Sequence, residues 1–243
     1  MEFTQGVRFD SLGLTEEVQR ALKKKNIEES TPVQAGCIPP MREWKDVIAK
    51  APTGTGKTFA FGIPIIEHIE PGSEETEAVI LAPTRELAMQ ITNELRDLCV
   101  YLPGVRIVCL YGGAPIGKQI DALKKRPQIV VATPGRLSDH MKRRTVKLDN
   151  VKTVVLDEAD RMLDMGFWPS VRRIMHALPE KHQTLLFSAT IPPSIKSTID
   201  ALLRDPAYVE IARVGQTADT VEEHLCPVTQ GQKTQLLEAL IRT

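Results

Sequence analysis

The sequence predicts an α/β fold in which helices cover both faces of a mainly parallel sheet. Short runs of β-branched and other apolar residues alternate along most of the chain with segments of helical periodicity. These runs, such as VIL and VVL, are apolar at consecutive positions, which is typical of strands buried on both faces of a parallel sheet. Ligands of such sheets bind beyond the carboxyl ends of the strands.

Seven strands are expected, at residues 46–51, 78–83, 105–111, 128–133, 152–157, 183–190 and 207–211. Amphipathic segments lie between them. In residues 85–102, an apolar side chain recurs at helical spacing, at Leu87, Ile91, Leu95 and Leu98. The alternation of strands with such segments predicts parallel strands joined by helical crossovers.

The chain changes character after residue 211. Residues 212–220 are polar and lack periodicity, which predicts a linker. A short strand is expected within 221–228, followed by a helix whose apolar face holds Leu236, Leu237, Leu240 and Ile241. We therefore expect an N-terminal domain over 1–211, a linker over 212–220 and the truncated start of a second domain over 221–243.

The composition is that of an ordinary globular protein, with 42% hydrophobic and 26% charged residues, which argues against a disordered chain. The longest apolar runs are too short to cross a bilayer, and the first ten residues contain no signal-peptide core. The four cysteines show no CxxC pairing, which favours buried thiols in a reducing compartment. A cytoplasmic monomer is expected, with the nucleus as an alternative if the source is eukaryotic.

The net charge is zero, but its distribution is uneven. Between Lys118 and Lys147 there are nine basic residues and two acidic ones, whereas Glu67 to Glu77 holds five glutamates and no lysine or arginine. This polarity is compatible with a phosphate-facing side. A solvated helix face explains it equally well.

A phosphate-binding loop is predicted at APTGTGKT, residues 51–58, because the segment follows a strand and opens a helix. Gly54 and Gly56 let the backbone turn tightly near an anion. Successive amides and the helix N-terminus, with about half a positive charge, would face it. Lys57 would reach the terminal phosphates and Thr58 would bind Mg²⁺. A plain glycine turn would leave the Lys-Thr pair unexplained.

Three carboxylates, Asp157, Glu158 and Asp160, crowd the end of the strand at 152–157. They repel one another, and burying them is unfavourable without positive charge. We expect this strand to lie beside the one that feeds the loop, so that Lys57 and Mg²⁺ neutralise Asp157. Glu158 would then orient and deprotonate an attacking water. A helix N-terminus carrying several acids is the alternative reading.

Seven motifs follow one another along the chain: STPVQ (30–34), APTGTGKT (51–58), PTRELA (83–88), GG (112–113), TPGR (133–136), DEAD (157–160) and SAT (188–190). With this set the sequence resembles the DEAD-box RNA helicases of superfamily 2, over residues 9–190. The resemblance implies a RecA-like P-loop fold, ATP and Mg²⁺ as cofactors, and RNA as a partner.

The resemblance also implies an ATP site with Lys57, Asp157 and Glu158 as catalytic residues. Mg²⁺ would be held by Thr58 and Asp157, partly through water. The other loop residues expected to bind the nucleotide are Thr53, Gly54, Thr55 and Gly56.

Adenine recognition is expected to involve Gln34, with Thr31 near the phosphates and Phe9 near the base. A buried glutamine that bonds only to backbone is the alternative for Gln34. The family usually has glycine and an aromatic residue where this chain has Asn26 and Ile27. The base would therefore meet the aliphatic side chain of Ile27.

The RNA backbone would be contacted, in a sequence-independent way, by hydroxyls, guanidinium groups and close-approach glycines. The positions that match the family are Thr84, Arg85, Gly112, Gly113, Thr133 and Arg136. Thr133 before Pro134 is also typical of a helix N-cap, and both roles are compatible.

Ser188 and Thr190 would couple the ATP and RNA sites through Asp160, unless they only cap a helix before Pro192.

The function implied for the complete protein is an RNA-dependent ATPase that locally separates short duplexes as two domains close. An ATP-gated RNA clamp uses the same motifs and stays open as an alternative. A small-molecule kinase would leave PTRELA, TPGR and SAT unexplained. The second RecA-like domain, with its arginine finger, is missing after the linker, so this chain alone is expected to be nearly inactive.

Overall fold

A computed structural model describes residues 5–192, 196, 199, 201–211 and 226–241, which separate into two compact units, Met1–Ala212 and Arg213–Thr243. The expected linker at 212–220 lies outside the described residues. Of the strand expected at 221–228, residues 221–225 also lie outside them, and residues 226–228 are not in a strand. The expected helix is present as α10 (Lys233–Ile241), preceded by a 3₁₀ turn, η2 (Gln230–Gln232).

The first unit contains all seven expected strands, each slightly shorter than predicted. They are β1 (Val47–Lys50), β2 (Ala78–Leu81), β3 (Ile107–Leu110), β4 (Ile129–Ala132), β5 (Thr153–Asp157), β6 (Gln183–Ser188) and β7 (Ala207–Glu210). They form one fully parallel sheet in the order β3-β4-β2-β5-β6-β1-β7. The predicted fold class is confirmed.

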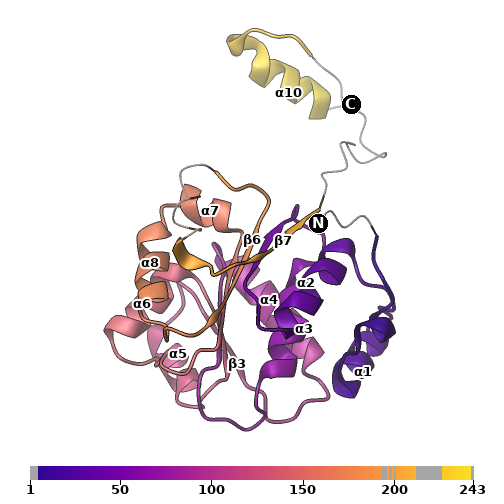
Figure 1. Ribbon diagram of the computed structural model, residues 1–243. Coiled ribbons are helices and arrows are strands. Elements are labelled where there is room, and N and C mark those ends of the chain that lie inside the picture. The colour runs from indigo at the N-terminus through magenta and orange to yellow at the C-terminus, as the bar shows by residue number, and fades with distance from the viewer. Residues whose placement is uncertain (1–4, 193–195, 197–198, 200, 212–225, 242–243) are drawn as a thin grey trace. The chain divides into compact units, whose positions relative to one another are not determined.

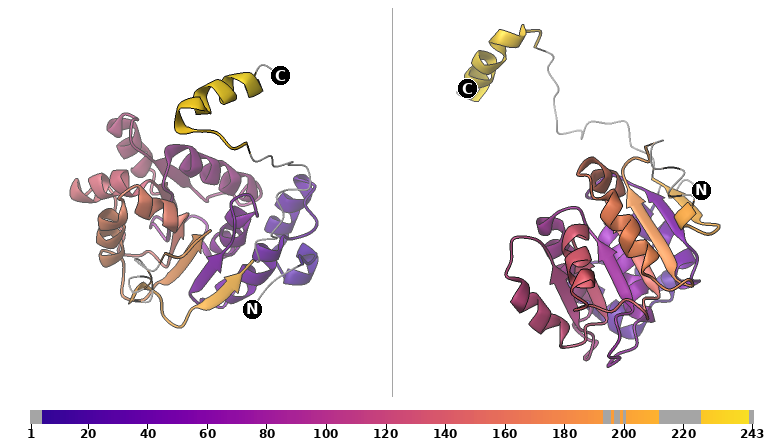
Figure 2. Two further views of the ribbon diagram at one scale, coloured as in Figure 1. Left: turned by 90° about the horizontal axis from the view of Figure 1, so that it is seen from above. Right: turned by 90° about the vertical axis from the view of Figure 1, so that its left-hand side faces the viewer.

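Helices cover both faces of the sheet, as Figures 1 and 2 show. On one side of Figure 1 lie α2 and α3, and on the other α6 and α8. The helices of this unit whose bounds the structure describes, with its 3₁₀ turn, are η1 (Phe9–Leu12), α1 (Glu16–Lys24), α2 (Pro32–Arg42), α3 (Lys57–His68), α4 (Arg85–Leu98), α5 (Ile116–Leu123), α6 (Pro134–Lys142), α7 (Ala159–Asp164) and α8 (Trp168–His176).

Consecutive strand residues face opposite sides, so the sheet divides the core in two. On one side Ala49, Ile80 and Phe187 pack with the side chains of α1 to α4. On the other side the core combines the intervening strand residues, such as Ile48 and Val79, with α6, α7 and α8. This two-sided burial explains why the strands read as continuous apolar runs.

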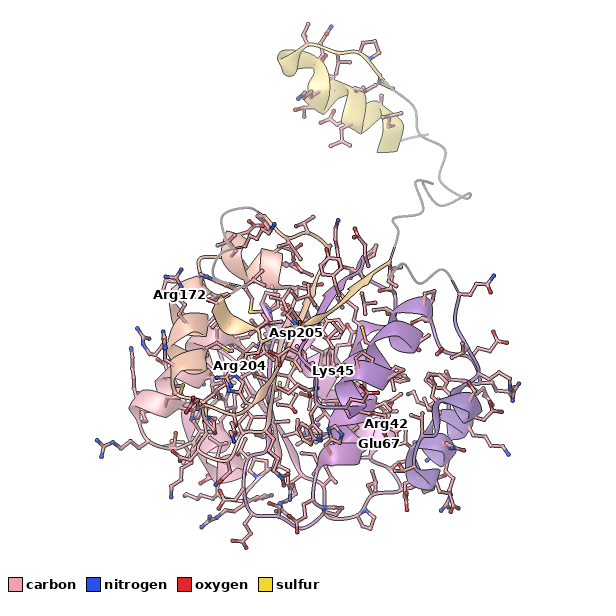
Figure 3. All side chains as sticks on the ribbon, in the orientation of Figure 1. Arg42, Lys45, Glu67, Arg172, Arg204 and Asp205 are labelled. Carbon is pink, nitrogen blue, oxygen red and sulfur yellow. The ribbon has the colours of Figure 1, made fainter. Side chains whose placement is uncertain are left out.

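The segment before α1 is fixed to the helices that carry the candidate site (Figure 3). Arg42 Nε lies 2.9 Å from Glu67 Oε2, and its Nη1 donates to the carbonyl of Leu12 at 2.8 Å. Glu67 Oε1 accepts from the amide of Thr15 at 2.6 Å. The Glu67 side chain is 4% exposed, so this nearly buried carboxylate is neutralised by one arginine.

One expectation about the sheet is wrong. The strand of Asp157 does not lie beside the strand that feeds the glycine loop, because β6 lies between β5 and β1. Strands β2, β4, β5 and β6 are buried on both faces, so the periodicity of their side chains contains no information about which strands are neighbours. Separately, no helix among the described residues is long and apolar enough to cross a membrane.

Candidate active site at the strand carboxyl ends

The predicted site residues gather at the carboxyl ends of the strands, where parallel sheets bind their ligands. They fall into two groups along the sheet. The glycine loop follows β1, the acidic cluster ends β5 and Ser188 ends β6. The residues predicted to contact RNA follow β2, β3 and β4, which occupy the other half of the sheet.

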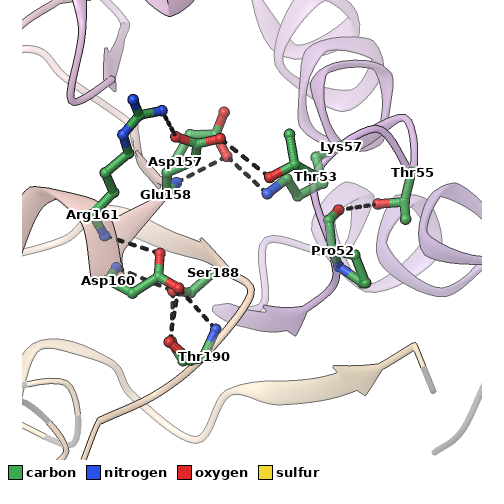
Figure 4. A network of polar contacts seen from close by, with 10 residues as sticks. All are labelled: Pro52, Thr53, Thr55, Lys57, Asp157, Glu158, Asp160, Arg161, Ser188 and Thr190. Carbon is green, nitrogen blue, oxygen red and sulfur yellow. Dashed lines mark hydrogen bonds and ion pairs between the residues drawn. The ribbon is translucent and has the colours of Figure 1, made fainter. Parts of the chain in front are cut away.

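The loop after β1 has the geometry of an anion-binding turn. Gly54 and Gly56 have φ of 84° and 87°, a left-handed conformation that glycine adopts without strain. Gly56 is the N-cap of α3, and Thr55 Oγ1 donates to the carbonyl of Pro52 at 2.8 Å (Figure 4). The N-terminus of α3 therefore opens at the strand ends.

Lys57 and Asp157 meet although their strands are not neighbours. Lys57 Nζ lies 3.8 Å from Asp157 Oδ1, and the two side chains are 7% and 3% exposed. This ammonium has no hydrogen-bond partner among the described residues. Burial raises the pKa of Asp157 to about 6, although the charge of Lys57 and a hydrogen bond from the backbone amide of Glu158 oppose the shift. The pair is therefore buried without being fully satisfied.

Glu158 sits at the sharp junction between β5 and α7, with φ 53° and ψ 54°. It is 8% exposed, and both of its carboxylate oxygens have partners. Thr53 Oγ1 of the loop donates to Oε1 at 3.4 Å, and Arg161 Nη1 lies 3.2 Å from Oε2 (Figure 4). The carboxylate thus lies between the loop and α7.

These residues fit a magnesium-bound triphosphate. The unpartnered Lys57 ammonium needs an anion, and the open space around Gly54 lets a ligand approach the backbone. Mg²⁺ retains several waters and needs only one or two carboxylates beside the phosphates. Asp157 with the hydroxyl of Thr58 supplies such a donor set. The described residues contain no cluster of three or more His, Cys, Asp or Glu, the pattern of an all-protein metal cage.

Gln34 faces the loop. Its Oε1 accepts from the amide of Thr31 at 2.9 Å, and its Nε2 donates to the carbonyl of Gly56 at 2.9 Å. Both ends of the amide are thus bonded to backbone, which is the alternative considered for this residue. An adenine contact by Gln34 remains a prediction.

Phe9 and Ile27 line one cavity of about 370 Å³. Phe9 is 3% exposed and belongs to the core, whereas Ile27 is half-buried. Neither Thr31 nor Gln34 is among the described residues that line this cavity. The two residues predicted to lie near the base therefore share a cavity that Gln34 does not line.

The six residues predicted to contact RNA lie after three adjacent strands, in the turns or in the first turn of the next helix. Thr84 caps α4 by accepting from the amide of Leu87 at 3.2 Å. Thr133 is the N-cap residue of α6, though its side chain makes no capping bond. Gly112 and Gly113 are exposed and have open space at the Cβ position.

The two arginines of this group are held by the loop that carries the glycines. Arg136 Nη1 donates to the carbonyl of Ala114 at 3.0 Å. The guanidinium of Arg85 lies 4.9 Å from the ring centre of Tyr111, a cation–π contact. Residues 111–114 therefore position both cations.

Asp160, which follows β5, is hydrogen-bonded to residues at and after the end of β6 (Figure 4). Its Oδ2 accepts from the amide and hydroxyl of Thr190 at 2.9 and 2.8 Å, and its amide donates to Ser188 Oγ at 3.1 Å. Partial burial would raise the pKa of Asp160, but the bonds from Thr190 and Ser188 hold it below the ordinary value. SAT and Asp160 are thus directly connected.

The sequence reasoning missed Arg161 and Tyr111. Arg161 follows Glu158 at i+3, a spacing that pairs charges on a helix, and this signal was available. Tyr111 precedes Gly112, but nothing in the sequence indicates that its ring faces Arg85.

The chain is similar to known proteins of one family. Residues 31–198 match a family model described as DEAD/DEAH box helicase. An ATP-dependent RNA helicase CshA of Limosilactobacillus reuteri is 46% identical over 235 residues, which are 97% of this chain and 47% of the relative. The DEAD-box ATP-dependent RNA helicase CshA of Bacillus subtilis (strain 168) is 44% identical over 239 residues, with the same coverage of 97% and 47%.

Solved structures give the same result. The crystal structure of a DEAD box protein from the hyperthermophile Methanococcus jannaschii has a TM-score of 0.81 and 36% identity, covering 98% of this chain and 64% of that one. That of a hypothetical ATP-dependent RNA helicase from Sulfolobus tokodaii has a TM-score of 0.76 and 34% identity, covering 81% and 57%. The chain spans about half the length of the curated relatives it matches.

Proposed function

The chain belongs to the DEAD/DEAH box helicase family, and on that premise we propose that it is the ATP-binding part of an RNA-dependent ATPase that locally unwinds short RNA duplexes. The observation that carries the proposal is the Lys57 ammonium, which is buried at the glycine loop beside Asp157 without a hydrogen-bond partner among the described residues. Burying a cation in this way is unfavourable until an anion binds it.

Each residue then has a physical role. The loop amides and Lys57 would bind phosphate oxygens, and Thr58 and Asp157 would hold Mg²⁺. When bound, MgATP supplies the phosphoanhydride bond and the metal charge that offsets Asp157. Glu158, oriented by Thr53 and Arg161, orients a water and takes up its proton.

RNA would bind through its backbone to the residues that follow β2, β3 and β4. Such contacts are independent of sequence, and they weaken as salt concentration rises. Asp160, Ser188 and Thr190 are joined by hydrogen bonds at the ends of β5 and β6, next to the half of the sheet that carries the predicted RNA contacts, and would couple the two sites.

Turnover requires more than this chain. We propose that a second RecA-like domain closes on these strand ends and supplies the arginine finger, which contributes a factor of roughly 10³–10⁵ in rate. That factor corresponds to about 4–7 kcal/mol of the barrier. The 243-residue chain alone should therefore bind MgATP and RNA weakly, hydrolyse ATP barely and not unwind duplexes.

Titration of the chain with a fluorescent ATP analogue and Mg²⁺ tests the nucleotide site. Lys57→Ala should weaken binding about 10- to 100-fold, the loss expected for a bond to a charged group. Lys181→Ala, which removes an exposed lysine, is the matched control and should leave the affinity unchanged. Equal affinities for wild type and Lys57→Ala would refute the site.

Steady-state ATP turnover by the chain with excess RNA tests the second statement. Slow turnover that rises when a two-domain form is assayed supports it. Robust turnover by the 243-residue chain would refute the missing-finger argument while leaving the nucleotide site intact.

A further inference from the structure

A cleft of about 530 Å³ lies along β3, which is an edge strand of the sheet. One wall comes from α4, with Met89, Asn93 and Arg96, and another from α5, with Lys118. Tyr111 lies at the end of the cleft nearest the strand carboxyl ends, because it directly follows β3. None of the described residues that line the cleft belongs to the seven sequence motifs.

The cleft is positively charged. Arg96 and Lys118 are both exposed, and no Asp or Glu is among the described residues that line it. Arg96 Nη2 donates to the carbonyl of Ile107 at 3.3 Å, which fixes the guanidinium against the edge strand. Lys118 has no ion-pair partner in the described part of the chain. Two cations in a cleft with no carboxylate among its described lining residues favour an anionic ligand.

The cleft continues from the surface that is proposed to bind RNA. Tyr111 belongs to both, because it lines the cleft and also lies under the guanidinium of Arg85. Ala114 does the same, since it lines the cleft while its carbonyl accepts from Arg136. An RNA strand that crosses the exposed Gly112–Gly113 turn can therefore reach the cleft without leaving the protein surface.

We propose that this cleft binds the segment of single-stranded RNA that leaves the strand-end surface. Arg96 and Lys118 bind two successive phosphates, and the Asn93 amide offers a donor and an acceptor to a ribose hydroxyl. Tyr111 and Met89 form an apolar wall for the sugar or base. The inference rests on the proposed RNA-binding function and lengthens its footprint beyond the family motifs.

RNA length provides the test. Affinities of the chain for oligouridylates of about 6 and about 12 nucleotides are measured between low and moderate salt, since single-strand sites span roughly 4–16 nucleotides. The longer RNA should bind more tightly and show a steeper salt dependence. In the variant Arg96→Gln/Lys118→Gln, the slope for the longer RNA should fall by about 1.4, or about 0.7 for each lost phosphate contact.

Two further variants separate a lost contact from a damaged fold. Lys118→Gln alone removes a side chain without an ion pair and should lower the slope by about 0.7. Arg173→Gln/Lys181→Gln removes one exposed arginine and one exposed lysine at α8 and the following loop, and should leave the slope unchanged.

The outcomes distinguish this inference from the proposed function. If the short RNA binds normally to all variants and only the longer RNA loses affinity in the cleft variants, the inference holds. If both lengths bind every variant equally, or lose affinity equally, the cleft is not on the RNA path. If wild type binds neither RNA at low salt, the proposed RNA function fails and the inference fails with it.

Discussion

Lys57 shows how binding and stability oppose one another at a single residue. A buried polar group without a partner costs about 1–3 kcal/mol, and more if it is charged. Asp157 compensates only in part, because its nearest oxygen is 3.8 Å away. The free energy of the site is thus higher than it would be with a hydrogen-bonded Lys57–Asp157 pair. An anion that binds Lys57 removes this cost, which favours its binding.

The contact between Arg85 and Tyr111 leads to a prediction at the same scale. Tyr111→Ala should weaken RNA binding about 2- to 5-fold, the range of an exposed cation–π contact. Tyr111→Phe should retain the affinity, because the ring remains. In a double-mutant cycle with Arg85→Ala the two losses should not add fully, because part of the Tyr111 effect acts through the position of Arg85.

A matched pair exists elsewhere on the molecule. Arg20 lies 4.2 Å from the ring centre of Tyr101, away from the strand ends. Tyr101→Ala should leave RNA affinity unchanged. Full additivity of Tyr111→Ala and Arg85→Ala in fluorescence-anisotropy titrations would contradict the positioning role.

At this scale the sequence predicts chemistry better than contacts. The meeting of Lys57 with Asp157 followed from charge compensation, and it held although the assumed strand order was wrong. The bonding of Gln34 to the carbonyl of Gly56 could not be predicted, because it depends on how α2 lies against the loop. The same limit applies to Tyr111, whose partner comes from a different element.

At the scale of elements, we expect substitutions at the two glycines of the loop to lower stability by different amounts. Gly54→Ala should lower stability by roughly 1–2 kcal/mol, the cost of a left-handed non-glycine residue. Gly56→Ala should cost more, because its Cβ would lie 2.5 Å from Gln34 Nε2 and displace that side chain. In thermal melts each kcal/mol corresponds to about 2–4 °C for a chain of this size.

Gly54 thus serves as the control for Gly56, since the two have nearly the same φ and no atom lies within 4 Å of a Cβ at Gly54. Equal losses in the two variants would mean that the contact between the loop and Gln34 does not contribute to stability.

Helices α5 and α6 are joined by a buried histidine. His140 is fully buried, with Nδ1 2.8 Å from Thr145 Oγ1 and Nε2 3.1 Å from Gln119 Oε1. Gln119 Nε2 in turn donates to the carbonyl of Tyr111 at 2.9 Å. This network of hydrogen bonds supports the turn that carries Gly112 and Gly113.

Burial holds the pKa of His140 below its ordinary value of 6.5, and nearby Arg136 and Arg143 act in the same direction against Asp139. The unfolded chain then binds the proton more readily. The stability contributed by neutral His140 is complete above pH 6.5 and is lost as the pH falls below it.

The prediction is a midpoint temperature that falls on acidification more steeply in wild type than in His140→Gln. His176→Gln, at an exposed position, is the control and should follow wild type. His68, whose pKa burial also lowers, is present in all three proteins and cancels in the comparison. Parallel curves for wild type and His140→Gln would contradict the assignment.

The existence and type of the elements could be predicted, whereas the order of the strands could not. The seven expected runs are strands, and the central ones are continuously apolar because they are buried on both faces. The insertion of β6 between β5 and β1 depends on how the crossover helices pack. Their amphipathic faces do not specify which pair of strands they cover.

At the scale of the whole molecule, the core of the first unit lies before the expected linker. Among the residues that the structure describes, both hydrophobic clusters consist of residues between Phe9 and Ile211. In the second unit, the apolar side chains of Leu237 and Leu240 on α10 are 57% and 59% exposed. We therefore propose the domain boundary near residue 211.

A chain of residues 1–211 should melt within a few degrees of the 243-residue chain and bind MgATP with the same affinity. Calorimetry and nucleotide titration of the two chains test this. A large drop in the midpoint temperature would show that residues after 211 stabilise the first unit and that the boundary is wrong.

The fully parallel arrangement of the sheet has one more consequence. All seven strands point in the same direction, so the glycine loop after β1 and the Gly112–Gly113 turn after β3 lie at the same edge of the sheet. A second domain that packed on this edge of the sheet would cover both sites in the same movement. The two sites could then be coupled through that shared surface, without a long-range distortion of the domain.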